Sequence, residues 1–194
     1  MNIVGSRWVC KIKGKPYGFV ERFKARLIAQ GYNQQEGIDF DKTFSPVVKA
    51  TTFRTIISIT VSLKWSICQL DVKNAFLYGV LSEEVHMAQP PEFVHPTYPH
   101  HVCKLHKEIY GLRQAPRAWF NRFSTEIMAA RFIGSKADPS VLVLKFSKGT
   151  VILFVDVDDI ILTGSSFFIG ICDWLFIFWL CHEGFGVLAL FSWH

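Results

Sequence analysis

The chain has few cysteines and no secretion signal. Its five cysteines are scattered over 194 residues, and no two have the spacing of a CxxC pair. An odd number without paired spacing argues against a disulfide framework and favours a reducing compartment. The opening residues MNIVGSRWVC contain no apolar stretch of the kind that forms the core of a signal peptide. We therefore expect a cytoplasmic protein whose fold does not depend on disulfides.

Long apolar runs are also missing, and so is positive charge near the C-terminus. The most apolar segment, FFIGICDWLFIFWLC, has 15 residues, whereas a membrane-spanning helix needs about 20. Basic flanking residues are absent, because no Lys or Arg follows Lys148. We therefore expect no stable membrane association. Residues 167–194 have neither helical nor strand periodicity, so we interpret this tail as sequence foreign to the preceding domain.

Positive charge is concentrated in two segments. Residues 1–50 contain nine Lys or Arg against four Asp or Glu, and residues 103–148 contain nine against three. The formal net charge of the whole chain is +5. Such segments are typical of proteins that bind polyanions, although many basic faces are simply solvated.

The pattern of apolar residues predicts an α+β domain. The segment KGKPYG reads as a turn between two short strands, and WSICQLDV reads as a strand. The segment APRAWFNRFSTEIMAARF has an apolar stripe at helical spacing, with a proline in its first turn. Residues 51–63 fit a helix capped by Thr51 or Thr52, although their β-branched content would also suit a strand. Further strands are expected at residues 140–146, 150–155 and 160–164, and the element order favours an antiparallel sheet.

Three aspartates, Asp156, Asp158 and Asp159, interrupt the apolar run VILFVDVDDIILTG. Carboxylates this close together resist ionisation unless something positive shares the site. Either the turn is exposed and the acids are solvated, or a divalent cation binds there. A metal site needs a further carboxylate, which Asp71 in CQLDVKNAFLYG supplies at the end of another apolar strand. Taken alone, Asp71 also fits a strand-end cap.

These residues belong to a wider set of motifs that resembles the reverse transcriptase domain of Ty1/copia-type retrotransposon Pol polyproteins. Five ordered blocks carry the resemblance over about residues 6–166: RWVCKIK, ERFKARLIAQGYNQQEGIDFDKTFSPVVKATTFRTI, QLDVKNAFLYGVLSEEV, VCKLHKEIYGLRQAPRAWF and VDDIILTGSS. The resemblance implies a right-hand polymerase fold, with fingers at residues 1–65 and a palm with an antiparallel sheet at residues 66–166. The thumb is missing, and the tail at 167–194 is not family sequence, so the chain looks like a truncated copy.

The resemblance also implies a mechanism and its catalytic residues. Asp71, Asp158 and Asp159 correspond to the carboxylates that bind two Mg²⁺ ions and catalyse two-metal nucleotidyl transfer. The partners implied are an RNA or DNA template, a DNA primer and dNTPs. Intact members of the family work in cytoplasmic virus-like particles.

Four further residues are implied to bind the incoming nucleotide. Phe76 matches the bulky residue that excludes a 2′-hydroxyl, although a core aromatic is the alternative. Gln114 matches the position that contacts the nucleotide, although it could be an exposed residue before a helix. Lys24 and Arg26 share one face of a strand and are candidates for binding the triphosphate, or else form a solvated basic face. Three arginines are candidates for template or primer phosphates: Arg113, Arg117 and Arg122.

The sequence departs from the family pattern at three places. Asp156 stands where the family commonly has Tyr, and it adds negative charge to the site. Glu92 stands where the family tends to have Gly, so we expect a strained backbone there. The resemblance ends after Ser166. We therefore expect a reverse transcriptase by descent that is inactive in this truncated form.

Other functions remain possible on the sequence alone. A haloacid-dehalogenase-type phosphohydrolase would explain an apolar strand that ends in DxD, but it would not explain QLDVKNAFLYG. A basic remnant that binds nucleic acid without catalysis would show salt-dependent binding and no nucleotide incorporation. A membrane-tethered fragment would have to use residues 160–181, which include a charged Asp173 and a Gly-Ser-Ser break.

Overall fold

The computed structural model describes residues 2–72, 74–147, 149–157, 159–165 and 187–192. The chain divides into two compact units. The first, called the hairpin unit, consists of Met1–Phe44 and Gly79–Trp119. The second, called the sheet unit, consists of Ser45–Tyr78 and Phe120–His194.

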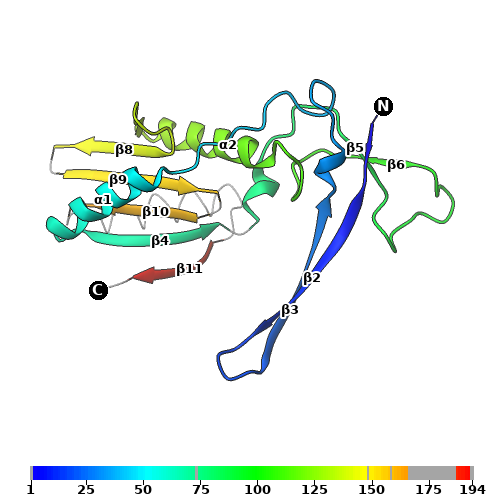
Figure 1. The fold of residues 1–194 in the computed structure, drawn as a ribbon, viewed down its shortest axis with the longest axis horizontal. Coiled ribbons are helices and arrows are strands. Elements are labelled where there is room, and N and C mark those ends of the chain that lie inside the picture. The colour runs from blue at the N-terminus through cyan, green and yellow to red at the C-terminus, as the bar shows by residue number, and fades with distance from the viewer. Residues whose placement is uncertain (1, 73, 148, 158, 166–186, 193–194) are drawn as a thin grey trace. The chain divides into compact units, whose positions relative to one another are not determined.

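The sheet unit is built on a six-stranded antiparallel sheet. Its strand order is β11-β4-β10-β9-β8-β7, and Figure 1 shows β8, β9, β10, β4 and β11 lying side by side. The strands are β4 (Ser66–Val72), β7 (Ile133–Gly134), β8 (Val141–Phe146), β9 (Gly149–Asp156), β10 (Asp159–Gly164) and β11 (Val187–Ser192). The strands that the sequence predicts at residues 65–72, 140–146, 150–155 and 160–164 are therefore confirmed, as is the antiparallel pairing.

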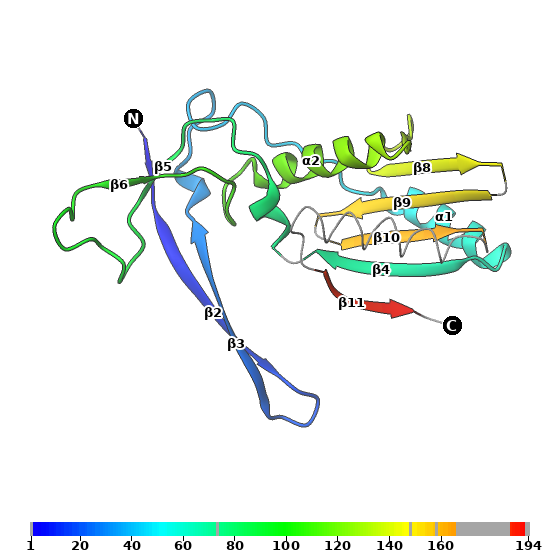
Figure 2. The same cartoon turned by 180° about the vertical axis from the view of Figure 1, so that it is seen from behind.

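Helix α1 (Ala50–Ser62) covers one face of this sheet. It lies in front of the strands in Figure 1 and behind them in Figure 2. Ile56 packs into a core with Val141 and Phe154, and the Phe53 ring meets the Phe154 ring edge-on at a centroid distance of 5.7 Å. The helical interpretation of residues 51–63 is thus confirmed, because burial of this apolar stripe outweighs the β-branched content.

The start of α1 differs from the sequence-based prediction. The N-cap residue is Lys49, not Thr51 or Thr52, and its side chain makes no capping bond. Instead, the backbone N–H of Lys49 donates to Asp138 Oδ2 at 3.0 Å. A carboxylate at this end satisfies one of the free N–H groups of the helix and complements its dipole. Burial raises the pKa of Asp138, but the hydrogen bonds from Ser140, Lys49 and Thr52 together outweigh burial and hold the pKa below its usual value.

Helix α2 (Ala115–Ala129) has Pro116 in its first turn, as the sequence predicts. Phe123 and Ile127 of its apolar stripe are buried. The helix ends before the predicted limit at residue 132, because Arg131 has a φ of 71° that does not continue an α-helix.

The hairpin unit contains two small sheets. One is a two-stranded ribbon of β2 (Ser6–Gly14) and β3 (Val20–Ala29), which extends away from the other sheet of the unit in both views (Figures 1 and 2). The other has the order β1-β5-β6, formed by β1 (Ile3–Val4), β5 (His86–Ala88) and β6 (Val102–Lys104). The predicted turn at KGKPYG is confirmed, because Gly18 has a φ of 84° and its N–H donates to Lys15 O. The flanking strands are longer than the short strands predicted, at nine and ten residues.

Most of the tail lies outside the described residues. Its described part is β11, which pairs antiparallel with β4. Among the helices that the structure describes, none has the length and apolar character that crossing a membrane requires.

Candidate active site

Three carboxylates form a row across neighbouring strands of the sheet unit. Asp159 at the start of β10 is paired with Asp71 on β4 and with Asp156 on β9. Residues directly opposite each other in an antiparallel sheet share a face, with Cβ atoms about 5 Å apart. Asp71 and Asp156 are exposed and Asp159 is half-buried. Asp158 lies outside the described residues.

A hydrogen bond fixes the orientation of the middle carboxylate. The Nε2 atom of Gln69 donates to Asp159 Oδ1 at 3.1 Å. Gln69 is paired with Ile161, two residues along β10, so its side chain lies on the same face as the row. An amide donor in this place leaves the second oxygen of Asp159 free to bind a cation or a phosphate-bound ion.

The donor set fits magnesium. Mg²⁺ prefers oxygen ligands and commonly takes only one or two carboxylates, with water and substrate phosphates as the rest. Asp71 and Asp159 supply two such carboxylates from adjacent strands. Within the described residues, no group of three or more His, Cys, Asp or Glu side chains could hold a metal ion. The pair would therefore depend on further oxygen ligands.

Asp156 also borders a cavity at the start of α1. The cavity has a volume of about 440 Å³. Its lining consists of Val48, Ala50, Phe53, Arg54, Phe154, Asp156 and Ile161. Phe154 and Ile161 lie on the α1 face of the sheet, which places the whole carboxylate row on that face.

The turn that joins β9 to β10 is strained. Val157 has a φ of 58°, in the left-handed region that a β-branched side chain rarely adopts. Such strain costs about 1–3 kcal/mol and is typical of functional turns. Glu92 has a φ of 70°, so the backbone strain predicted at this position from the resemblance is confirmed.

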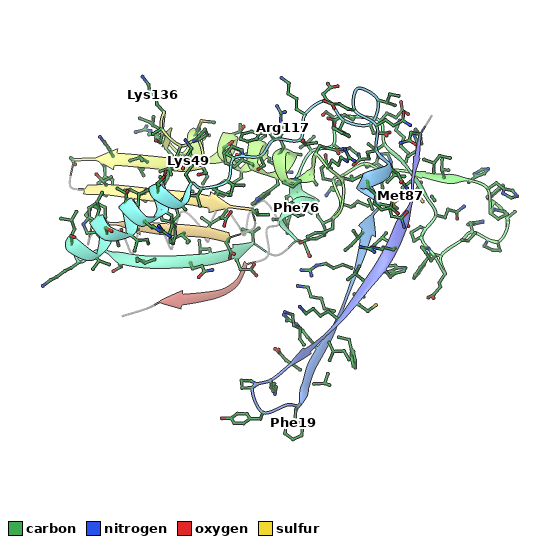
Figure 3. The ribbon with its side chains drawn as sticks, in the orientation of Figure 1. Phe19, Lys49, Phe76, Met87, Arg117 and Lys136 are labelled. Carbon is green, nitrogen blue, oxygen red and sulfur yellow. The ribbon has the colours of Figure 1, made fainter. Side chains whose placement is uncertain are left out.

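Phe76 lies in the short 3₁₀ helix η2 (Ala75–Tyr78), which follows β4 (Figure 3). Its side chain is half-buried. Arg122 of α2 donates from Nη1 to Tyr78 O at 3.0 Å, and this bond fixes the end of η2. Arg122 therefore has a structural partner, and its predicted contact with nucleic acid stays a prediction.

The hairpin unit carries the predicted nucleotide-binding residues Lys24, Arg26 and Gln114. Lys24 and Arg26 lie on one face of β3, as the alternation predicts. The Arg26 guanidinium carbon lies 5.1 Å from the centroid of the Tyr110 ring, a cation–π distance. Its Nε atom is buried and makes no hydrogen bond.

Gln114 is buried, with 2% of its surface exposed, so the alternative of an exposed residue before the helix is wrong. Its Oε1 accepts from Gln34 Nε2 at 3.0 Å. The Nε2 atom of Gln114 is buried without a partner in the structure. An unsatisfied buried donor is costly, so this atom is suited to a ligand acceptor.

Arg113 is engaged within its own unit. Its Nε donates to Gly31 O at 2.9 Å, and its guanidinium carbon lies 5.5 Å from the centroid of the Phe40 ring. Its backbone N–H donates to Gln34 Oε1 at 2.8 Å. Arg117 is half-buried. The predicted template contacts of both arginines stay predictions.

Sequence reasoning missed Gln34, Gln69 and Glu108. Loop packing brings Gln34 to its hydrogen-bond partners Gln114 and Arg113, and strand register brings Gln69 to Asp159. A single sequence reveals neither. Glu108 is fully buried, and neither of its carboxylate oxygens has a hydrogen-bond partner in the structure. Burial, together with the nearby Glu83 charge, raises the pKa of Glu108 to about 8.

Comparison with known proteins identifies the family to which these motifs belong. The family described as "Reverse transcriptase (RNA-dependent DNA polymerase)" matches residues 1–172. The chain is 47% identical over 166 residues to the retrovirus-related Pol polyprotein from transposon RE2 of Arabidopsis thaliana, covering 86% of the chain and 11% of that protein. It is 45% identical over 161 residues to the corresponding polyprotein from transposon TNT 1-94 of Nicotiana tabacum, covering 82% of the chain and 12% of that protein. The chain thus spans about a ninth of the length of these relatives.

Proposed function

The chain belongs to the reverse transcriptase family of copia-type retrotransposon Pol polyproteins, and on this basis we propose that it performs two-metal nucleotidyl transfer. The sheet unit would serve as the palm, and the β2–β3 ribbon would serve as part of the fingers. Family membership excludes the phosphohydrolase alternative. The proposed substrates are dNTPs, added to a DNA primer on an RNA or DNA template.

The observation that carries this proposal is the pairing of Asp71 with Asp159. The pairing places two carboxylates on one face, at the ends of two central strands of the sheet. Two Mg²⁺ ions held by Asp71, Asp158 and Asp159 would activate the primer hydroxyl and stabilise the leaving pyrophosphate. Gln69 would keep the Asp159 carboxylate in position through its hydrogen bond.

The remaining residues would bind and select the nucleotide. Lys24 and Arg26 would neutralise triphosphate oxygens, because cations in a preorganised site stabilise the charge of the transferring phosphoryl group. The Nε2 atom of Gln114, buried without a partner, would donate a hydrogen bond to a nucleotide oxygen. Phe76 would exclude a 2′-hydroxyl by its bulk.

Asp156 would weaken this activity. It is paired with Asp159, so a third carboxylate lies next to the metal-binding pair. The Cβ atoms of directly paired residues lie about 5 Å apart, so the negative charge of Asp156 lies close to the metal-binding pair. This charge would repel the negative triphosphate as the nucleotide binds beside Asp159. We therefore propose that the wild-type chain, which its sequence departures lead us to expect to be inactive, incorporates nucleotides poorly at most, and that Asp156→Tyr raises the rate.

The test is Mg²⁺-dependent primer extension on an RNA template by the purified chain. The Asp156→Tyr variant should incorporate dNTPs faster than the wild type, and adding Asp159→Asn to that variant should abolish incorporation. Asp41→Asn, a change at an exposed aspartate of the hairpin unit, serves as the matched control and should change nothing. Absence of incorporation by both the wild type and Asp156→Tyr would refute the polymerase proposal. Salt-dependent binding without incorporation would instead support a non-catalytic nucleic-acid-binding remnant.

A further inference from the structure

We propose that Gln34 is a positioning residue for nucleotide binding, which holds the side-chain amide of Gln114 in the one orientation that presents a hydrogen-bond donor to the nucleotide. The inference deepens the proposed function, on which it rests, because it names what sets the orientation of a residue proposed to contact the dNTP. Gln34 acts through Gln114 and does not touch the nucleotide itself. A relay of buried hydrogen-bonding groups in the hairpin unit carries the inference.

The orientation of the Gln34 amide is set by a backbone group. The backbone N–H of Arg113 donates to Gln34 Oε1 at 2.8 Å. A backbone N–H can only donate, so the end of the Gln34 amide that meets it has to be the oxygen. The amide nitrogen of Gln34 therefore points away from this N–H. Because only 5% of Gln34 is exposed, solvent offers this side chain almost no alternative partner.

Gln34 in turn sets the orientation of Gln114. Its Nε2 lies 3.0 Å from the Oε1 atom of Gln114. An amide nitrogen donates and does not accept, so turning the Gln114 amide over would bring two donors face to face. The Nε2 atom of Gln114 is therefore directed to the other side, where it is buried and has no hydrogen-bond partner in the structure. The relay thus begins at a backbone donor and ends at an open side-chain donor.

The two segments that carry the glutamines are in direct backbone contact. Gln34 follows the short 3₁₀ helix η1 (Gly31–Asn33), and its backbone N–H donates to Gly31 O at 3.1 Å. The Nε atom of Arg113 donates to the same oxygen at 2.9 Å. An added Cβ at Gly31 would overlap the carbonyl oxygen of Gly111. Packing this close gives the two glutamines little freedom to move apart.

A glutamine held in this way selects a hydrogen-bond acceptor. A free glutamine can turn its amide and offer either its oxygen or its nitrogen to a ligand. Gln114, held by Gln34, offers only N–H. A buried donor without a partner is costly, and a ligand oxygen that meets it removes the cost. Nucleotides carry acceptor oxygens on both the sugar and the triphosphate, whereas a ligand group that only donates would be rejected.

A purely structural role explains the relay less well. The bonds from Arg113 to Gln34 Oε1 and to Gly31 O already join the two segments. The further bond from Gln34 to Gln114 leaves a buried N–H without a partner, which destabilises the chain when no ligand is present. A bound nucleotide oxygen would complete the relay.

The test is isothermal titration calorimetry of the full chain with Mg²⁺ and dTTP, applied to a double-mutant cycle. Gln114→Ala removes the donor and should weaken binding at least about fivefold. Gln34→Met keeps the length of the side chain but releases the Gln114 amide, so it should weaken binding at least about threefold. In the presence of Gln114→Ala, adding Gln34→Met should change the affinity by less than about 1.5-fold, because its effect passes through Gln114.

A second variant covers the case in which Gln34→Met does not fold. Gln34→Glu keeps an acceptor for the Arg113 N–H but replaces the donor that faces Gln114 by an oxygen. The Gln114 amide would then turn its Nε2 toward this oxygen and present an acceptor to the nucleotide. Gln34→Glu should therefore weaken dTTP binding as much as Gln114→Ala does.

The matched control is Gln35→Met, the same change at the next residue, which is exposed and should leave the affinity unchanged. Titration with Mg²⁺ and tripolyphosphate identifies the oxygen. Gln114→Ala should weaken binding of both ligands if the oxygen lies on the triphosphate, and of dTTP alone if it lies on the nucleoside. Either pattern supports the proposal.

Three results would overturn it. Equal losses of affinity from Gln34→Met with and without Gln114→Ala would show that Gln34 only supports the fold. Unchanged affinity of both Gln34→Met and Gln34→Glu would show that the relay does not orient Gln114. Absence of dTTP binding by the wild type would remove the ligand that the relay is proposed to serve.

Binding and incorporation separate this inference from the proposed function. Coupled losses of dTTP affinity, without incorporation by any variant, would overturn polymerase activity alone. Incorporation by Asp156→Tyr, together with unchanged dTTP affinity of both Gln34 variants, would overturn the Gln34 proposal alone.

Discussion

Glu108 makes the stability of the chain depend on pH. Its carboxyl group is fully buried and makes no hydrogen bond in the structure. Burial and the charge of Glu83 raise its pKa from 4.5 to about 8 in the folded state. At neutral pH the folded chain therefore keeps a proton on Glu108, whereas the unfolded chain releases it.

The sign and size of the effect follow from this difference. Below pH 4.5 the Glu108 carboxyl group is protonated in both the folded and the unfolded chain, so its ionisation does not change the free energy of unfolding. As pH rises from 4.5 to 8, only the unfolded state loses the proton, so the free energy of unfolding falls by about 1.4 kcal/mol per pH unit. The full loss is about 5 kcal/mol, reached above pH 8, and about 3 kcal/mol of it is present at pH 7. Such a loss is a large part of the stability of a typical domain.

The assay is urea unfolding of the wild type and Glu108→Gln, followed by circular dichroism from pH 5 to 9. The free energy of unfolding of the wild type, relative to the variant, should fall by several kcal/mol over this range, because Gln has a similar shape and no titrating proton. Using the difference removes the contribution of the histidines, which both proteins share. Glu36→Gln, a change at an exposed glutamate, should keep the wild-type slope. A slope for Glu108→Gln equal to that of the wild type would refute the reasoning.

Four further substitutions test the fold by the same unfolding assay. Gly111→Ala should lower the free energy of unfolding by more than about 3 kcal/mol, because Gly111 has a φ of 92° and an added Cβ would lie 2.1 Å from Ala29 O. Gly18→Ala, at a position where an added Cβ meets no other atom, should lower it by about 1 kcal/mol. Phe154→Ala should cost about 3–5 kcal/mol, since the ring is 1% exposed and packs on Phe53; a cost below 1 kcal/mol would contradict this packing. Val157→Gly should raise the free energy of unfolding by about 1 kcal/mol by relieving the positive φ, and any loss of stability would argue against strain.

The sequence predicted the central strands well because their signal is local. In β9, Leu153 and Phe154 point to opposite faces and both are buried. A strand buried on both faces is an uninterrupted apolar run, bounded here by turn residues, and such a run is visible without knowing its neighbours. The same holds for α1, whose apolar stripe repeats at helical spacing.

The features that the sequence did not predict depend on distant partners. Lys49 starts α1 because Asp138, 89 residues away, accepts its N–H, so a rule based on neighbouring threonines selects the wrong cap. Gln69 reaches Asp159 across 90 residues only because β4 and β10 pair in one particular register. A shift of one residue would move Gln69 to the other face.

The same register explains how a substitution at Asp156 can affect the candidate active site without removing a carboxylate that is proposed to bind the metal. Asp156 ends β9 opposite Asp159, which is itself opposite Asp71, so the three charges lie in line on one face. A metal ion between Asp71 and Asp159 would offset their mutual repulsion and leave Asp156 as the carboxylate without a counterion. Its negative charge would then act on whatever anion approaches that ion, which in nucleotidyl transfer is the triphosphate. Asp156→Tyr should therefore lower KM for dNTP more than it changes metal affinity, and Asp156→Asn, which removes only the charge, should recover most of that gain.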